Sequence, residues 1–125
     1  MRASGFSLVE VRRDERLAGF AFGFSMRRGG WWANASLPPP DVLDAPKFAV
    51  VELVVERTER GAGLGGALLD ALLCERPEPI ATLAAVLGAD AYGWYVRRGC
   101  RKAAEFRVEP PHSDALVLDL RGAAA

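Results

Sequence analysis

The clearest pattern of apolar and polar positions lies in the middle of the chain. Residues 50–55 read Val-Val-Glu-Leu-Val-Val, where Glu52 is the single polar residue and four of the five apolar residues are β-branched. Such a run predicts a strand that is buried on both faces. Apolar residues then recur at the helical spacing i, i+3, i+4, i+7 and i+8, which predicts an amphipathic helix. These helical positions are Leu64, Ala67, Leu68, Ala71 and Leu72.

Weaker patterns predict the rest of a sheet. Segments 6–12 and 17–26 alternate on either side of a polar turn, which predicts a β-hairpin. In the second segment, small residues share one face, which is open to a closely packed helix, and phenylalanines share the other, which we expect in the core. Further strands are predicted at 80–86, 104–108 and 116–120. Residues 27–46 are predicted to form a loop, and a short helix is predicted within 88–100, with its end at Gly99. Because a helix separates strands 50–55 and 80–86, these two should pair in parallel through a right-handed crossover.

Composition narrows the class of protein. The 125 residues, half of them hydrophobic, suit one domain spanning residues 1–125. Sixteen basic and sixteen acidic residues balance, which argues against a nucleic-acid-binding protein. No apolar run reaches membrane-spanning length and the first residues lack a signal-peptide pattern, so we expect a cytoplasmic protein without membrane contact. Cys74, Cys100 and His112 lack the spacing of metal ligands, so we expect no metal site.

Four glycines, at positions 61, 63, 65 and 66, lie where the predicted strand turns into the predicted helix. Free backbone N–H groups and the positive end of the helix dipole make such a junction a phosphate site. A nucleoside-triphosphate loop is excluded, because Ala67 and Leu68 stand where that loop needs Lys and Ser or Thr. The dinucleotide pattern G-x-G-x-x-G is present, with Asp90 as a ribose contact, and stays a rival although the five residues 56–60 separate it from the strand.

Two stretches resemble the signatures of one enzyme superfamily. Leu53-Val54-Val55, then Arg60-Gly61-Ala62-Gly63-Leu64-Gly65 and Leu68-Leu69, resemble the acetyl-coenzyme A motif of the Gcn5-related N-acetyltransferases (GNAT). Residues 88–100 resemble the second GNAT signature through Ala91, Tyr95 and Gly99, with Trp94 replacing another aromatic residue and Gly88 replacing an Asn. The resemblance covers nearly the whole chain. The family's first strand and two helices have no counterpart, so the sequence is expected to be a short member.

This resemblance implies an α/β (α+β) fold of the GNAT type. The sheet would be mixed and largely antiparallel, with a central, splayed parallel strand pair and flanking helices. The resemblance further implies that acetyl-CoA is the co-substrate, with its pantetheine arm between the splayed strands. The implied cofactor-binding residues are Leu53, Val54, Val55, Arg60, Gly61, Ala62, Gly63, Leu64, Gly65, Gly66 and Tyr92. The implied reaction is transfer of an acetyl group to a primary amine of a small molecule or peptide by direct attack.

The resemblance also suggests roles in catalysis. Tyr95 matches the family's tyrosine and is the candidate acid for the leaving thiolate, since a phenol near pKa 10 can exchange a proton with a thiol near 8.5. Glu52, the only carboxylate in its strand, is the candidate base, with an ordered water as the alternative. Trp31 and Trp32 are candidates for the acceptor site, or for packing against the sheet edge. The basic cluster Arg97, Arg98, Arg101 and Lys102 either meets the cofactor's phosphates or forms a solvated face.

Two functions remain open at this point. One is an acetyl-CoA-dependent N-acetyltransferase with an amine acceptor. The other is a degenerate GNAT-like domain that binds acyl-CoA or a protein partner without turnover, which Gly88 and the absent first elements favour. A homodimer is expected, because segment 6–12 would lie at an exposed sheet edge.

Overall fold

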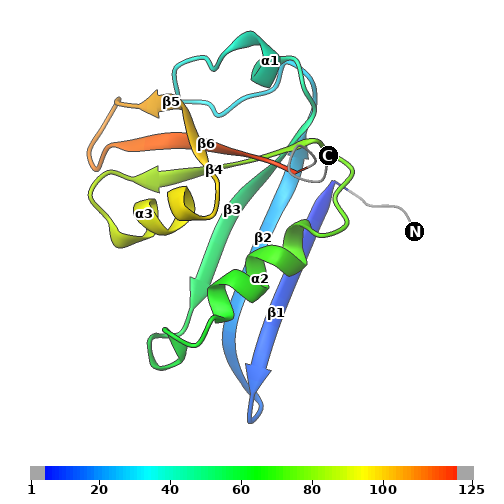
Figure 1. Cartoon of the computed structure of the whole chain (residues 1–125), viewed down its shortest axis with the longest axis vertical. Coiled ribbons are helices and arrows are strands. Elements are labelled where there is room, and N and C mark those ends of the chain that lie inside the picture. Colours follow the sequence, from blue (N-terminus) through cyan, green and yellow to red (C-terminus); the bar gives the residue numbers. More distant parts are fainter. Residues whose placement is uncertain (1–4, 121–125) are drawn as a thin grey trace.

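One six-stranded sheet organises the computed structural model, which describes residues 5–120. The strands lie in the order β1-β2-β3-β4-β6-β5, and every neighbouring pair is antiparallel except β3 and β4. This is the mixed, largely antiparallel sheet that the resemblance implied, and α2 crosses the face formed by β1, β2 and β3 (Figure 1). The elements in chain order are β1 (Phe6–Arg13), β2 (Arg16–Met26), α1 (Pro40–Leu43), β3 (Lys47–Val55), the 3-10 turn η1 (Arg57–Glu59), α2 (Leu64–Leu73), β4 (Ile80–Val86), α3 (Asp90–Arg97), β5 (Arg101–Phe106) and β6 (Ser113–Asp119).

The predicted hairpin is confirmed as β1 and β2. Its two-residue turn, Asp14-Glu15, has positive φ at both positions, 53° and 67°, the backbone twist that suits a tight antiparallel connection. The small face of β2 does admit a helix, because a Cβ at Gly19 would lie 2.9 Å from Leu68 Cδ1 of α2. No larger residue fits there without moving the helix. Within residues 5–120, no helix is long and apolar enough to cross a membrane.

The expectation that the phenylalanine face of β2 belongs to the core is wrong. Phe24 is 43% exposed, and Phe20 and Phe22 are only partly buried. Leu8 of β1, which is opposite Phe22, is 52% exposed. On this side of the sheet the segment 27–46 packs with Val42 against Ile80 and Val117, on β4 and β6. The apolar surface of β1 and β2 on that side therefore stays open among the described residues.

The burial of strand β3 changes half-way along its length. The strand begins at Lys47, three residues before the predicted start, and residues 47–50 are buried. Of the predicted span 50–55 only Val50 is buried, and Val51 and Val54 are 39% and 38% exposed, so the expectation of burial on both faces is wrong for this span. The reason lies in the pairing with β4, which runs from Lys47 opposite Ile80 to Ala49 opposite Thr82 and then stops. Beyond that point the two strands diverge (Figure 1).

Helix α2 is turned slightly from its predicted orientation. Leu64, Leu68 and Leu72 are buried as expected, but Leu69 joins them, and Ala67 and Ala71 are exposed. The larger side chains take the core positions because they remove more apolar area from water. The last two strands begin three residues earlier than predicted, and β5 includes the charged residues 101 and 102, whose pairing with β6 the apolar pattern alone could not reveal.

A buried ammonium group orders the segment predicted as a loop. Lys47 is fully buried at the start of β3, and its Nζ donates hydrogen bonds to the carbonyl oxygens of Gly30 at 2.9 Å, Leu43 at 3.3 Å and Ala45 at 2.8 Å. Burial lowers the pKa of Lys47, and the negative charge of Asp44 acts in the opposite direction. Through these three hydrogen bonds, Lys47 holds the segment on both sides of α1 against the sheet.

The tight approach of β2 to β3 generates a prediction for stability. A Cβ at Gly23 would overlap the carbonyl oxygen of Ala49 and lie 2.8 Å from Phe48 Cε2. We expect Gly23→Ala to lower the free energy of unfolding by about 1–3 kcal/mol, the usual range for overpacking a core. Gly5→Ala is the control, because a Cβ there meets nothing within 4 Å. Equal urea midpoints for the two variants would contradict this account.

Candidate functional site

A groove of about 790 Å³ opens where β3 and β4 diverge. Its walls come from the second half of β3, the glycine loop, the first turn of α2 and one face of α3. Of the predicted cofactor-binding residues, Leu53, Val54, Val55, Arg60, Gly61, Gly63, Leu64, Gly65 and Gly66 line it. The predicted residues that do not line it are Ala62 and Tyr92.

The glycine loop turns the chain sharply from β3 into α2. Gly61 and Gly63 have φ of 87° and 82°, in the left-handed region that glycine adopts without a steric penalty. Gly63 is the N-cap of α2, and no side chain caps the helix. Its carbonyl oxygen accepts the N–H of Ala67 at 3.1 Å, so the amide groups of residues 64–66 precede the first intrahelical bond. These donors, at the positive end of the helix dipole, suit an anionic ligand.

Two arginines add positive charge to the groove. Arg60 and Arg97 both line it, and neither forms an ion pair within residues 5–120. The Nε of Arg60 donates only to the carbonyl oxygen of Val55, at 3.2 Å. The next arginine along α3 is different, because Arg98 pairs with Asp70 at 2.7 Å. Two carboxylates also line the groove, those of Asp90 and of Glu59, which pairs with Arg13 and Arg16. Arg60 and Arg97 form no ion pair with either of them, and such free guanidinium groups suit phosphate oxygens.

A tyrosine hydroxyl completes the groove on the α3 side. Tyr95 lines the groove, and burial raises its pKa, with smaller contributions from Cys100 and from the charge of Glu52. The phenol therefore keeps its proton at neutral pH and can donate it. Burial also raises the pKa of Cys100 to about 11, so this thiol is protonated at neutral pH and unsuited to act as a nucleophile.

Known structures share this arrangement of strands and helices. The Arabidopsis thaliana NAA60 structure in complex with acetyl-CoA matches with a TM-score of 0.72 and 16% identity over 96% of this chain and 79% of that one. The ribosomal-protein-S18-alanine N-acetyltransferase from Escherichia coli matches at 0.67 and 16%, over 95% and 72%. Ard1 from Thermoplasma volcanium matches at 0.64 and 17%, over 85% and 65%. The chain has the GNAT fold.

The likeness to GNAT proteins lies in the structure rather than in the overall sequence. No protein-family profile matches the chain, and no curated protein shows significant sequence similarity to it. The chain spans slightly less than two thirds of the length of the Ard1 structure.

Glu52, the candidate base, lies outside the groove. It is exposed, and it is opposite Phe22 of β2 on the sheet face away from α2. A bulge near Val51 gives Glu52 this orientation, since the register between β2 and β3 shifts by one residue there. Its negative charge nonetheless contributes to the raised pKa of Tyr95, so the two candidate catalytic groups lie close enough to interact electrostatically.

Tyr92, Trp31 and Trp32 do not line the groove. The hydroxyl of Tyr92 donates to Asp114 Oδ2 at 2.5 Å instead of facing the groove. Trp31 packs against Val42, Ile80 and Val117, and its Nε1 donates to the carbonyl oxygen of Ser36 at 2.8 Å. Trp32 Nε1 donates to Thr82 Oγ1 at 3.0 Å. Both tryptophans contact the interior strands β4 or β6, and their place at an acceptor site stays a prediction.

One face of α3 supplies groove residues that the sequence reasoning did not assign to the cofactor. Asp90, Trp94 and Arg97 line the groove at the helical spacing i, i+4 and i+7, and Ala91 joins them. This periodicity was present in the sequence and would have selected Arg97 from the basic cluster. The other cluster members pair elsewhere: Arg98 with Asp70, Arg101 with Asp119 and Lys102 with Glu105.

Proposed function

We propose that this protein is an acetyl-CoA-dependent N-acetyltransferase that acts on a primary amine of a small molecule or peptide. The observation that carries the proposal is the groove itself, in which the uncapped first turn of α2 and the free guanidinium groups of Arg60 and Arg97 lie beside the protonated Tyr95. The likeness to structures solved with acetyl-CoA or coenzyme A supports the choice of ligand.

Acetyl-CoA would lie in this groove with its pyrophosphate at the glycine loop and its thioester near Tyr95. Its pyrophosphate would accept hydrogen bonds from the backbone N–H groups of the loop around Gly63, with Arg60 and Arg97 beside it. Its pantetheine arm would extend along β3, where the edge facing β4 is unpaired after Ala49 and offers backbone groups to the amides of the arm. The thioester would then reach the inner end of the divergence, on the side of Tyr95.

The transfer itself needs one nucleophile and two proton movements. The neutral amine attacks the thioester carbonyl carbon, and a C–N bond forms as the C–S bond breaks. The nitrogen loses a proton to water or to Glu52, and the departing thiolate takes a proton from the Tyr95 hydroxyl. Because the exposed Glu52 lies outside the groove lining, an ordered water that relays the proton toward it fits better than direct contact.

A second function, acyl-CoA binding without turnover, has one observation in its favour. Gly88 has a φ of 83° and carries no side chain where the GNAT signature has an Asn that helps to hold the pantetheine. A free-thiol release assay with a panel of small amines and peptides separates the two functions. Release above the rate of hydrolysis supports the transferase, and acetyl-CoA binding without release supports the binding domain.

Binding of acetyl-CoA at the glycine loop can be tested with a matched pair of variants. Gly63→Glu places a carboxylate at the proposed pyrophosphate site, so we expect acetyl-CoA affinity measured by calorimetry to fall at least tenfold. Gly29→Glu is the control, because Gly29 has a φ of 83°, close to the 82° of Gly63, and a Cβ at either position meets nothing within 4 Å. Both variants carry the same strain and charge. Equal affinities for the two folded variants would reject the site.

Proton donation by Tyr95 predicts a selective loss of rate. Tyr95→Phe should keep the affinity for acetyl-CoA and lower kcat by roughly 10²–10⁴, the usual contribution of a positioned acid. The measurement is steady-state kinetics with an active acceptor, next to thermal unfolding to verify the fold. A kcat within a few-fold of the parent would assign Tyr95 to packing alone.

We also propose a homodimer that forms through β1. This strand lies at one edge of the sheet, and the exposed Leu8 and Phe24 continue onto the neighbouring open face. Sheet edges with apolar side chains readily pair with a second chain. Light scattering at high micromolar concentration should give the mass of a dimer, and Leu8→Lys should reduce it to that of a monomer. A monomeric parent protein would reject the proposal.

A further inference from the structure

Helix α3 carries five groove residues but packs only partly against the rest of the molecule. None of its eight residues is fully buried, and its N-cap, Ala89, provides no side-chain hydrogen bond. Yet Trp94, Tyr95 and Arg97 must be held in place for the groove to keep its shape. Most helices in proteins are stabilised by packing of an apolar face. In α3 this packing comes from the partly buried Tyr92, Trp94 and Tyr95, so a polar attachment adds to its stability.

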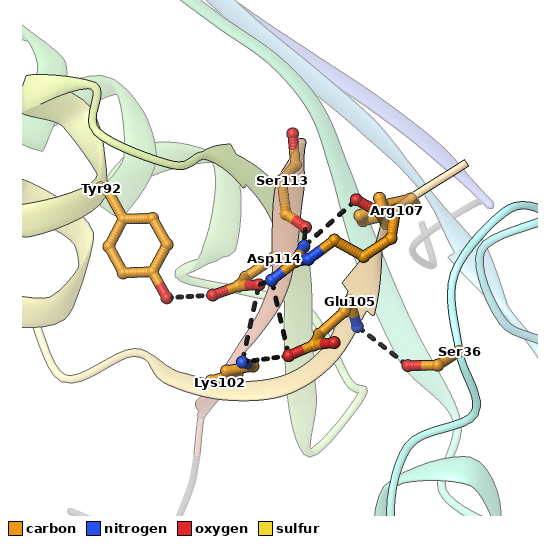
Figure 2. A network of polar contacts seen from close by, with 8 residues as sticks. Ser36, Tyr92, Lys102, Glu105, Arg107, Ser113 and Asp114 are labelled. Atoms are coloured by element: carbon orange, nitrogen blue, oxygen red, sulfur yellow. Dashed lines mark hydrogen bonds and ion pairs between the residues drawn. The ribbon is translucent and has the colours of Figure 1, made fainter. Parts of the chain in front are cut away.

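A buried carboxylate provides this attachment from behind the helix. Asp114 lies in β6 opposite Ala85 of β4, and only 3% of the residue is exposed. Its Oδ2 accepts the hydrogen bond from the Tyr92 hydroxyl at 2.5 Å (Figure 2). Its Oδ1 accepts a hydrogen bond from Arg107 at 2.9 Å, and Lys102 Nζ lies 3.8 Å away from the same oxygen. Figure 2 shows Tyr92 approaching the carboxylate from one side, Arg107 from the opposite side and Lys102 from below.

The charge on Asp114 makes the link to Tyr92 a strong one. Burial by itself would raise the pKa of Asp114, but the hydrogen bonds from Tyr92 and Arg107 and the charge of Lys102 outweigh burial and leave the pKa lowered. The hydrogen bond to Asp114, together with burial, raises the pKa of Tyr92 to about 12. At neutral pH a neutral phenol thus donates to an ionised carboxylate, and such charge-assisted bonds are about twice as strong as neutral ones.

The other polar contact of α3 is weaker. Arg98 pairs with Asp70 of α2 at 2.7 Å, but the side chain of Asp70 is largely exposed. Solvent-exposed ion pairs contribute about 0–1 kcal/mol. The link from Tyr92 to Asp114 is therefore the main polar attachment of the helix in the described part of the chain.

The spacing along the helix connects this attachment to the groove. Tyr92 and Tyr95 are three residues apart, so they are neighbours on the helix surface. A change in the rotation of α3 about its axis would move both rings together. We propose that Asp114 is a positioning residue for acetyl transfer, which holds α3 through the Tyr92 hydroxyl and thereby places the Tyr95 hydroxyl at the thioester. The identity of the reaction rests on the proposed function, whereas the attachment of α3 does not.

Hydrogen exchange tests the attachment without any assumption about activity. Tyr92→Phe removes one hydroxyl and leaves Asp114 paired with Arg107 and Lys102. We expect the backbone amides of residues 94–98 to exchange about tenfold faster or more, while the amides of the sheet keep their rates. Asp119→Asn is the control, since it removes an exposed ion pair with Arg101 on the same two strands. Unchanged exchange in α3 of Tyr92→Phe would overturn the proposal.

A double-mutant cycle tests the effect on catalysis. If Tyr92 acts through Tyr95, Tyr92→Phe should lower kcat by about 10–100-fold, the cost of a small misplacement, while KM for acetyl-CoA changes less. In the Tyr95→Phe background the same substitution should have almost no further effect on kcat. An equal fall in both backgrounds, or an unchanged kcat in Tyr92→Phe, would overturn the positioning role.

The two measurements also separate the failure of this inference from failure of the proposed function. If the parent protein releases no thiol with any amine, the N-acetyltransferase function fails and the catalytic part of the inference fails with it. The exchange rates of α3 then decide the attachment by themselves. If the parent is active and the cycle is additive, the proposed function stands and only the positioning role of Asp114 is rejected.

Discussion

The divergence of β3 and β4 is the constraint on which the rest of this structure depends. The two strands share only the pairing from Lys47 opposite Ile80 to Ala49 opposite Thr82. After that point neither strand satisfies the backbone groups on the facing edge of the other, and such groups need another partner. A ligand that carries amide groups and enters the divergence would supply one. The groove is thus a consequence of incomplete strand pairing as much as of the side chains that line it.

Keeping the strands apart requires support on both faces of the sheet. On one face, α2 packs so closely that β2 must present Gly19 beneath Leu68. On the other face, the buried ammonium group of Lys47 gathers three carbonyl oxygens of segment 27–46 over the region where the strands still pair. A lysine there is expensive to bury, and its three hydrogen bonds offset part of that cost. The support from Lys47 acts on the paired end of β3, whereas the contact at Gly19 lies beside Val54 and Val55 at its other end.

Polar contacts add to the apolar packing that holds the wall of the groove bearing Tyr95. The polar cluster around Asp114 also contacts segment 27–46, on the other face of the sheet from α3. The backbone N–H of Glu105 in β5 donates to Ser36 Oγ at 3.0 Å, and Glu105 also pairs with Lys102 (Figure 2). Hydrogen bonds and ion pairs therefore connect segment 27–46, on one face of the sheet, to α3, on the other face. Because buried polar networks tolerate little distortion, this link favours a single arrangement of the two faces.

Local sequence by itself determined the strands, the glycine loop and the helix that follows it. Periodicity sufficed to locate β1, β2, β4 and α2, because alternation and the 3.6-residue repeat distinguish strands from helices. It did not settle which side chains are buried in β2 and α2. The loop around Gly63 was equally predictable, since glycines between a strand and a helix mark a phosphate-binding turn. Tyr95 and most of the groove lining followed from the same two stretches.

Only the tertiary structure decided which of these residues face one another. Glu52 lies outside the groove because a register shift between β2 and β3 places its side chain on the other face of the sheet. The Tyr92 hydroxyl donates a hydrogen bond to Asp114, which is 22 residues further along the chain. Phe24 stayed exposed because no described element covers that side of the sheet at β2, although its residue type predicted the core. Burial and pairing between distant segments depend on how far two strands stay together. The length over which β3 and β4 stay paired depends on the packing of α2, α3 and segment 27–46 together. No local stretch of the sequence contains that information.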